Sequence, residues 1–295
     1  MALSTCNTTT NKQGLELVEH GSIAFPIACY HDDLSKDGVP WHWHPELEFA
    51  LVTKGSTILA VDSEKIELKE GSGFFINSEV LHAAAICGLE CRFHSIVFHP
   101  RLVGGSMDSV FWQKYLEPLI SNPALRYLCL SPSIPWQNEI LAGIETAWQS
   151  CANDSEEYEF HVRSALSHVV FLLSKHSPGC RVRLSEKTLR NEERLKLMLQ
   201  YIHLHFSDEL TIAQISSCAF ISESECLRCF QNTIGKSPIQ YVKQFRIQKA
   251  AELLVATELK IADIAAQCGF QEMSYFSKSF REAKGCTPSE FRKRQ

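Results

Sequence analysis

The feature that most constrains the fold is an internal duplication in the C-terminal third of the chain. Residues 210–220 are matched by residues 259–270, and beyond a one-residue difference in the turn the offset stays at 50. The aligned pairs further on are Arg228 with Lys278, Phe230 with Phe280, Gly235 with Gly285, Pro238 with Pro288, and Tyr241 with Phe291. A fixed period of this kind marks a repeated structural unit. The sequence therefore predicts two copies of one small unit.

The first copy is predicted to be a short helix, a tight turn and a second helix. Thr211 with Gln214, and Ser222 with Glu225, have the spacing of capping boxes, which mark the starts of helices. The second helix is expected from about Glu223 to Thr233. Helical periodicity assigns to its buried stripe Cys226, Cys229 and Phe230, and to its outer face Glu223, Ser224, Leu227, Arg228 and Gln231.

The second copy repeats this design. Its second helix is expected to turn Phe276, Phe280 and Ala283 inward, and to expose Met273, Ser274, Ser277, Lys278 and Arg281. Ser237-Pro238 and Thr287-Pro288 each supply an N-cap followed by proline, so each opens a further helix. The helix that begins at Pro238 runs to about Val255 and joins the two copies.

Paired units of this kind are typical of DNA recognition. A helix-turn-helix places its second helix in the major groove, and two units on a stiff connecting helix can enter successive grooves about 34 Å apart. The alternative is a helical bundle whose outer faces are merely solvated. Repetition, capping and outward cations together favour DNA binding.

The charge is divided unevenly along the chain. Residues 1–188 carry 14 Lys and Arg against 22 Asp and Glu, a net −8, whereas residues 189–295 carry 15 against 12, a net +3. Only the second part is therefore expected to meet a polyanion. A net charge of +3 argues against a non-specific architectural DNA protein, because such proteins depend on many phosphate contacts.

Length and composition predict two globular domains, since the chain has 295 residues of which 45% are hydrophobic. No apolar run approaches the roughly 20 residues that a membrane-spanning helix needs, and the polar start lacks the pattern of a secretion signal. We therefore expect a cytoplasmic protein without membrane partners. In that compartment the 12 cysteines are expected to be reduced and to act as small buried hydrophobes.

Short strands are predicted in the N-terminal third, where glycines and polar turns separate apolar segments. The expected strands are residues 47–53, 57–61, 65–68, 73–76 and 91–98. Regular short strands of this kind predict a sandwich or a barrel.

Four candidate ligands lie among these strands: His42, His44, Glu48 and His82. His42 and His44 alternate on one strand, so both side chains are expected on the same face. Three imidazoles and a carboxylate can bind a divalent metal ion. They can equally hold a polar small-molecule effector through hydrogen bonds without a metal, or they can be purely structural.

The spacing of these four residues resembles the cupin motif pair, His-x-His-x3-Glu-x6-Gly followed by a later Gly…His. In metal-bearing cupins the four residues hold iron, manganese, zinc or nickel, so the resemblance implies a cupin-like barrel. Two positions depart from the pattern: Asn77 stands where proline is common, and Glu79 stands where glycine is common.

The C-terminal motifs resemble the AraC/XylS family of bacterial transcription regulators. The resemblance is carried by residues 261–270, 275–281 and 285–291, and it covers about residues 190–295. It implies a domain of seven helices with two helix-turn-helix units, preceded by a cupin-like barrel that binds a small effector.

The resemblance also implies which side chains face the bases. In the first unit these are Ser224, Leu227 and Arg228, and in the second Met273, Ser274, Ser277 and Lys278. Position 278 departs from the arginine common there. Because lysine lacks the planar fork that pairs with guanine, the second helix is expected to contact phosphate more than base.

An αα-hairpin is predicted between these regions, because residues 140–151 and 162–173 carry apolar side chains at helical spacing. The resemblance favours homodimerisation through it, and packing within one chain is the alternative. The expected organisation is an N-terminal tail at 1–20, an effector-binding barrel at 21–105, a helical dimerisation region at 106–176, a linker at 177–188, and the DNA-binding domain at 189–295.

These features together predict an α+β multidomain protein, a non-enzymatic, sequence-specific transcription regulator controlled by a small molecule. Its expected partners are double-stranded promoter DNA, the effector, a second copy and, for an activator, RNA polymerase. The alternative is a metal-dependent cupin oxygenase or isomerase that carries a DNA-binding domain.

Overall fold

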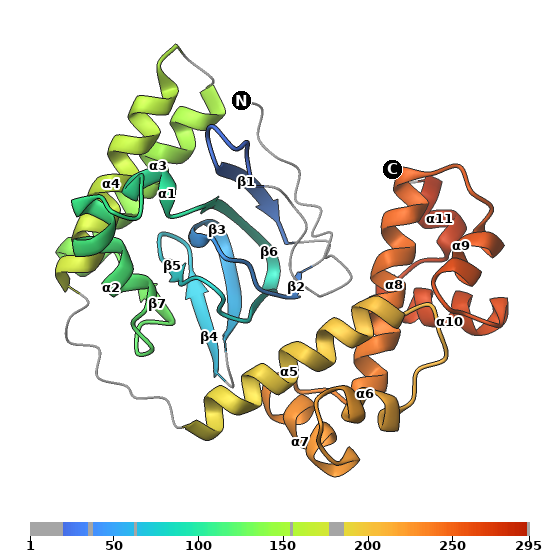
Figure 1. Ribbon diagram of the computed structural model, residues 1–295. Helices are drawn as coiled ribbons and strands as arrows, with labels where there is room; N and C mark the ends of the chain where they lie inside the picture. Colours follow the sequence, from blue (N-terminus) through green and yellow to red (C-terminus); the bar gives the residue numbers. More distant parts are fainter. Residues whose placement is uncertain (1–19, 35–37, 62–63, 154–155, 177–185, 294–295) are drawn as a thin grey trace. The chain divides into compact units, whose positions relative to one another are not determined.

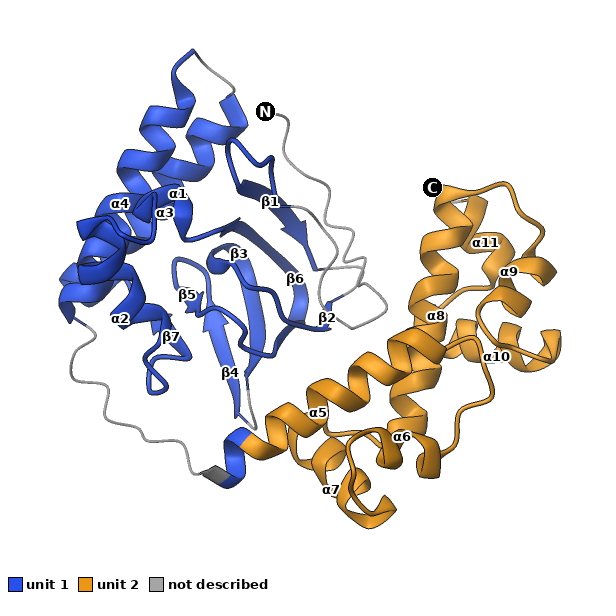
Figure 2. Ribbon diagram, in the orientation of Figure 1, with its two compact units in different colours: residues 1–10, 15–189 blue, residues 11–14, 190–295 orange. Residues whose placement is uncertain are grey.

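The computed structural model describes residues 20–34, 38–61, 64–153, 156–176 and 186–293. Most of the expected N-terminal tail and of the expected linker lie outside these ranges. The described chain forms two compact units that divide between Leu189 and Arg190 (Figure 2). The first combines a sheet with helices and the second is helical (Figure 1). None of the described helices has the length and apolar character needed to cross a membrane.

One antiparallel sheet organises the first unit. Its strands are β1 (Ile27–Asp33), β2 (Val39–His42), β3 (Leu47–Val61), β4 (Glu64–Lys69), β5 (Gly73–Ile76), β6 (His82–Phe98) and β7 (Tyr127–Leu130). Their order is β1-β6-β3-β5-β7, with β2 paired to β6 and β4 paired to β3. The two long strands β3 and β6 pair along most of their length. They therefore form the centre to which every strand except β7 is bonded.

The long strand β3 corrects the prediction of two strands separated by a turn at Lys54-Gly55. The pairing of β3 with β6 continues past this point, with register shifts between Val52 and Lys54 and between Gly55 and Thr57. Gly55 has a φ of +72°, and a Cβ there would lie 1.9 Å from the carbonyl oxygen of Glu90. The glycine thus permits a bulge within a continuous strand. Likewise β6 begins at His82 and not near Cys91.

The two faces of the sheet bury different cores, as strand alternation requires. Phe49 and Phe75 belong to a core shared with α3 (Pro135–Asn153) and α4 (Tyr158–His176). Ala50 and Phe74, their neighbours in sequence, belong to a second core on the other face. The predicted αα-hairpin therefore covers the outer face of the sheet within one chain. The face that carries Ala50 also carries Glu48, because the two residues are two positions apart on β3.

Short helical segments between β6 and α3 are additions that periodicity did not predict. They are α1 (Arg101–Gly104), the π-helix η1 (Trp112–Leu116) and α2 (Glu117–Ile120). Strand β7 follows them and pairs with β5. Residues beyond 105 thus contribute to the sheet as well as to the helical layer.

The described C-terminal part has the seven helices that the family resemblance implies, and the first of them begins four residues before the boundary between the two compact units. They are α5 (Glu186–His205), α6 (Ile212–Cys218), α7 (Glu223–Thr233), α8 (Pro238–Ala256), α9 (Ile261–Gln267), α10 (Met273–Lys284) and α11 (Pro288–Lys293). The first helix-turn-helix is α6–α7 and the second is α9–α10. Thr211 and Ser237 form reciprocal capping boxes with Gln214 and Gln240.

Two expectations for these helices are wrong. Ser222 accepts a bond from the backbone of Glu225, but the Glu225 side chain does not complete a capping box, because it pairs with Arg228 and lies 3.9 Å from Arg194. Ala283 is exposed, and Ser279 takes its place in the buried stripe of α10 with Phe276 and Phe280. Ala283 lies in the last turn of α10, next to the helix end at Lys284.

Candidate functional site

The structure brings the four candidate ligands of the first unit together. His42 ends β2, His44 follows two residues later, Glu48 is the second residue of β3, and His82 begins β6. One ligand atom from each lies within 4.8 Å of those of the other three, and all four residues are buried. We call this set the His/Glu cluster. The pairing of β6 with both β2 and β3 joins these distant parts of the sequence.

The carboxylate of Glu48 is the hub of the His/Glu cluster. Its Oε2 lies 2.8 Å from Nε2 of His82 and 3.2 Å from Nε2 of His44. The ring of His42 lies against that of His82, with centroids 4.2 Å apart. Burial alone would raise the pKa of Glu48, but the charge of His82 and the hydrogen bonds from both imidazoles outweigh it and hold that pKa well below its usual value. Positive charge at the imidazoles therefore favours the ionised form of Glu48.

The outer nitrogen of each histidine fixes how the ring is protonated. The Nδ1 atoms of His42 and His82 each lie 2.8 Å from a backbone carbonyl oxygen, of Pro40 and Val80, and Nδ1 of His44 lies 3.3 Å from that of Glu46. A carbonyl can only accept, so each Nδ1 must carry a proton. In a neutral imidazole the other nitrogen, Nε2, is then an acceptor.

An acceptor nitrogen facing a carboxylate oxygen at 2.8–3.2 Å is unfavourable unless positive charge lies between them. That charge is either a proton on the imidazole or a metal ion that both groups ligate. Carbonyl bonds at Nδ1 are also the usual outer contacts of metal-binding histidines. The donor set, its proximity and its outer bonds therefore fit a divalent metal such as zinc, iron or nickel.

A fourth imidazole, which sequence reasoning missed, stands beside the His/Glu cluster. His20 is buried, its Nδ1 lies 2.9 Å from the hydroxyl of Tyr30, and its ring meets that of His44 edge-on at 5.5 Å. No motif marks this histidine, since it lies 22 residues before His42 in the sequence. Only the pairing of β1 with β6 carries its partner Tyr30 into the site.

Both departures from the cupin pattern have a structural counterpart. Asn77 is buried, and its Nδ2 donates to the carbonyl oxygens of Leu119 and Leu125 at 3.0 and 2.7 Å. Proline could not make these bonds. Glu79 adopts a φ of +61°, the left-handed conformation that glycine takes most readily, and its N–H donates to the carbonyl of His44 at 2.8 Å. The segment before His82 is thereby tied both to α2 and to His44.

The outer face of α7 carries the side chains that the sequence assigned to base contact. Ser224, Leu227 and Arg228 are all exposed, and Arg228 has 63% of its side chain exposed while it pairs with Glu225. Cys226, Cys229 and Phe230 are buried beneath them.

The outer face of α10 is arranged in the same way. Met273, Ser274 and Lys278 are exposed, and Ser277 is half-buried. Phe276 and Phe280 are fully buried on the opposite side. The two helix-turn-helix units thus each expose the outer face of their second helix.

Comparison with known proteins identifies the family. Residues 24–170 match the family model of the AraC-like ligand binding domain, and residues 215–294 match that of a helix-turn-helix domain. The "Uncharacterized HTH-type transcriptional regulator YdeC" of Bacillus subtilis (strain 168) is 31% identical over 282 residues, 94% of this chain and 95% of that protein. The chain belongs to the AraC/XylS family of transcriptional regulators. It is accordingly a DNA-binding regulator with an N-terminal ligand-binding domain.

Less similar proteins also align with most of the chain. The "HTH-type transcriptional activator RhaR" of Pectobacterium carotovorum subsp. carotovorum (strain PC1) is 24% identical over 259 residues, 86% of each chain. Among solved structures, unsaturated fatty acid bound wild-type ToxT from Vibrio cholerae strain SCE256 is 15% identical, with 90% of this chain and 94% of that one covered and a TM-score of 0.44.

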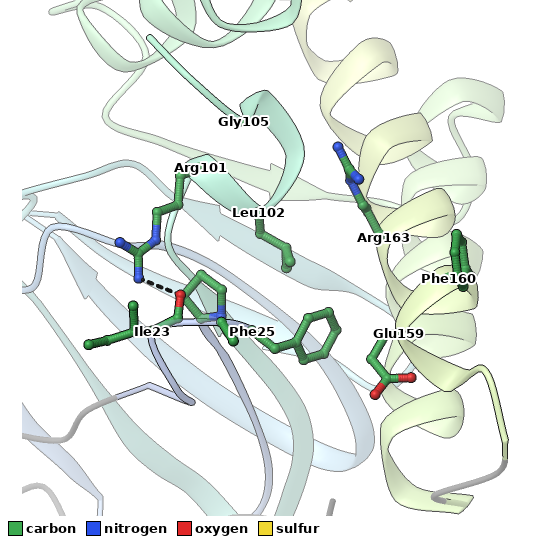
Figure 3. Close-up of a pocket in the computed structure, with 10 residues that line it drawn as sticks. Ile23, Phe25, Arg101, Leu102, Gly105, Glu159, Phe160 and Arg163 are labelled. Atoms are coloured by element: carbon green, nitrogen blue, oxygen red, sulfur yellow. Dashed lines mark hydrogen bonds between the residues drawn. The ribbon is translucent and has the colours of Figure 1, made fainter.

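The AraC-like ligand-binding domain also has a hollow of about 460 Å³ that none of the His/Glu cluster lines. Figure 3 shows Leu102 of α1 and Phe25 on one side of the hollow and α4, which carries Glu159 and Arg163, on the other, while Arg101 turns toward Ile23. Arg101 donates to the carbonyl of Ile23 at 3.1 Å. Ile23 and Phe160 at its margin are 89% and 78% exposed, so this is a surface groove and not an enclosed ligand chamber.

Proposed function

We propose that the His/Glu cluster holds a divalent metal ion and that this metal completes the effector site of an AraC/XylS regulator. The observation that carries the proposal is the convergence of Nε2 of His44 and of His82 on the Glu48 carboxylate, while Nδ1 of each ring faces a backbone carbonyl. His42, His44, Glu48 and His82 would be the ligands. A metal bound there would act as a Lewis acid toward an oxygen of a small polar effector.

Metal content tests this proposal directly. We expect the purified full chain to hold about one equivalent of transition metal, and His44→Ala to lose it. His31→Ala is the matched control, because His31 is an exposed imidazole on β1 outside the His/Glu cluster. A metal-free wild type that also fails to take up Zn²⁺ or Co²⁺ on titration would refute the metal. The positive charge would then be protons, and the site would bind its effector through hydrogen bonds alone.

We further propose that this site recognises a ligand and does not turn over a substrate. The regulator names of the relatives support this. The competing function is a cupin oxygenase or isomerase that uses the same four residues. Incubation of the metal-loaded protein with a candidate effector that thermally stabilises it separates the two, because a regulator returns the effector unchanged and an enzyme converts it.

For the helical C-terminal unit we propose that α7 and α10 read successive major grooves of promoter DNA. The base-facing residues would be Ser224, Leu227 and Arg228, together with Met273, Ser274, Ser277 and Lys278. The exposure of both outer faces supports this, and so does α8, whose 19 residues make a connector about 28 Å long. Selection of bound sequences from random DNA, with and without metal and effector, tests the proposal. A failure to enrich any sequence would refute it.

We also propose that the regulator acts as a cytoplasmic homodimer in a bacterium, and that as an activator it would contact RNA polymerase. The outer side of α4 supports dimerisation, since Phe160 and Phe171 are 78% and 44% exposed. Phe160→Glu should shift the sedimentation coefficient of the protein from dimer to monomer. Leu89→Glu is the control, because Leu89 is a fully exposed residue of β6. A monomeric wild type at micromolar concentration would refute the dimer.

A further inference from the structure

The two helix-turn-helix turns share one backbone motif. After α6, the N–H groups of Phe220 and Ile221 donate to the carbonyls of Ser217 and Ser216, at 3.1 and 3.2 Å. After α9, the N–H groups of Gly269 and Phe270 donate to those of Ala266 and Ala265, both at 2.9 Å. This is the Schellman pattern, which places one residue in the left-handed region. That residue is Phe220 in the first turn, with φ +53°, and Gly269 in the second, with φ +76°.

The two residues at this position meet opposite surroundings. A Cβ on Gly269 would lie 2.8 Å from the carbonyl oxygens of Phe206 and Ser207, so only glycine fits. The side chain of Phe220 is 94% exposed. Its left-handed conformation is strained, because the Cβ of an L-residue crowds the following carbonyl there. The first turn therefore has a strained backbone and a solvent-exposed aromatic ring. Glycine at position 220 could form the same backbone hydrogen bonds without the strain.

The position of Phe220 indicates what such a ring could contact. It lies two residues before Ser222, the N-cap of α7. The N-terminal residues of a recognition helix are the ones that approach the bases. The side chains of Ser217, Ser222 and Ser224 nearby are exposed and polar. An isolated ring among serines lacks the apolar core that a protein interface requires, whereas single apolar side chains commonly pack on thymine methyl groups.

We propose that Phe220 is a DNA contact that packs against a thymine methyl group and the adjoining sugar at the rim of the groove that α7 enters. This inference rests on the proposed DNA-reading role of α7. It assigns to the first unit an apolar contact for which the second unit has no counterpart, because Gly269 has no side chain. The contact carries no charge, so it adds affinity without adding to the salt dependence of binding.

Phe220→Gly separates the ring from the strain, since glycine adopts the left-handed region without cost. Phe220→Asn is a second variant, because asparagine also tolerates this region. We expect the full chain with either substitution to be as stable as the wild type or more so, and to bind a DNA site selected by the wild type 5- to 30-fold more weakly. The slope of log K against log salt should stay unchanged.

Arg228→Ala, measured beside these variants, separates the Phe220 contact from the DNA-reading role of α7. If Arg228→Ala weakens binding while Phe220→Gly keeps the wild-type affinity within twofold, the Phe220 contact is refuted and the role of α7 stands. If neither substitution weakens binding, the role of α7 is refuted. A loss of folding stability in Phe220→Gly, or a loss of promoter activation with intact DNA affinity, would also overturn the inference, because the ring would then serve the fold or a protein partner.

Discussion

The two helix-turn-helix units have the same backbone plan but are stabilised differently. In the first, both helices begin with a side-chain cap, from Thr211 and from Ser222. In the second, Lys260 and Glu272 occupy those positions without a side-chain cap bond. The second turn instead packs at Gly269 against the chain that follows α5, where Arg246 of α8 donates to the carbonyls of Phe206 and Asp208, both at 2.6 Å. A duplicated sequence can thus keep its geometry while one copy relies on local bonds and the other on its neighbour.

The largest difference should appear at the left-handed turn residue. Gly269→Ala should lower the free energy of unfolding by about 2–4 kcal/mol, because it combines left-handed strain with a steric clash against backbone. Phe220→Gly should raise it by about 0.5–1 kcal/mol, since the first turn has no such contact. Urea unfolding of both variants measures this. Equal effects would contradict the proposed division between local and neighbour-dependent stabilisation.

Arg228 and Lys278, the cations on the outer faces of α7 and α10, should contribute differently to DNA binding. Arg228→Ala should cost about 1–3 kcal/mol at a selected site and relax base preference there, because arginine pairs with guanine through two donors. Lys278→Ala should weaken binding to all sequences alike and reduce the salt slope by about one. Binding titrations at several salt concentrations, with selected and scrambled DNA, provide the measurement. If Lys278→Ala changed base preference as strongly as Arg228→Ala, the second helix would read bases in the same way.

Low pH should lower the stability of the first helix-turn-helix unit more than that of the second. His203 donates to or accepts from the hydroxyl of Tyr241 at 2.8 Å, and burial lowers its pKa to about 3. The unfolded chain takes up this proton below about pH 6.5, so stability is lost as the pH falls from there toward 3, by up to about 1.4 kcal/mol per pH unit. At the position that matches Tyr241, the second helix-turn-helix unit has the apolar Phe291.

The double variant His203→Leu, Tyr241→Phe replaces this buried polar pair with apolar side chains. The free energy of unfolding of this variant should fall less steeply between pH 6.5 and 4 than that of the wild type. Parallel pH profiles would show that the buried imidazole does not titrate on unfolding.

The smallest effect is expected at the caps. Ser222→Ala should lower the free energy of unfolding by about 1 kcal/mol, because it removes the bond to the backbone N–H of Glu225. Glu272→Ala, at the corresponding start of α10, should change it by less than about 0.5 kcal/mol, as for an ordinary surface substitution. Thermal unfolding of the two variants checks this, and comparable losses would contradict the difference in capping.

The sequence predicted the helical C-terminal unit more fully than the N-terminal unit, because the signals for helices and their caps are local. Capping residues and helical periodicity placed α7 at Glu223–Thr233, and that prediction is confirmed. Ala283 was predicted wrongly to be buried, because periodicity does not indicate where the end of a helix extends beyond the elements that pack against it. In the first unit the motif spacing picked out four residues that lie together, yet it did not reveal His20, the unbroken course of β3 through Gly55, or the return of β7 to β5. These features depend on long-range pairing, which the local pattern does not encode.

Asn77 couples the His/Glu cluster mechanically to the helical layer. It lies at the start of the loop that leads from β5 to His82, and its Nδ2 donates to the carbonyls of Leu119, within α2, and of Leu125, after α2. Any rearrangement of this loop must therefore either move the turn after α2 with it or break these buried hydrogen bonds. A change at His82 that moved this loop would in this way also displace the C-terminal end of α2.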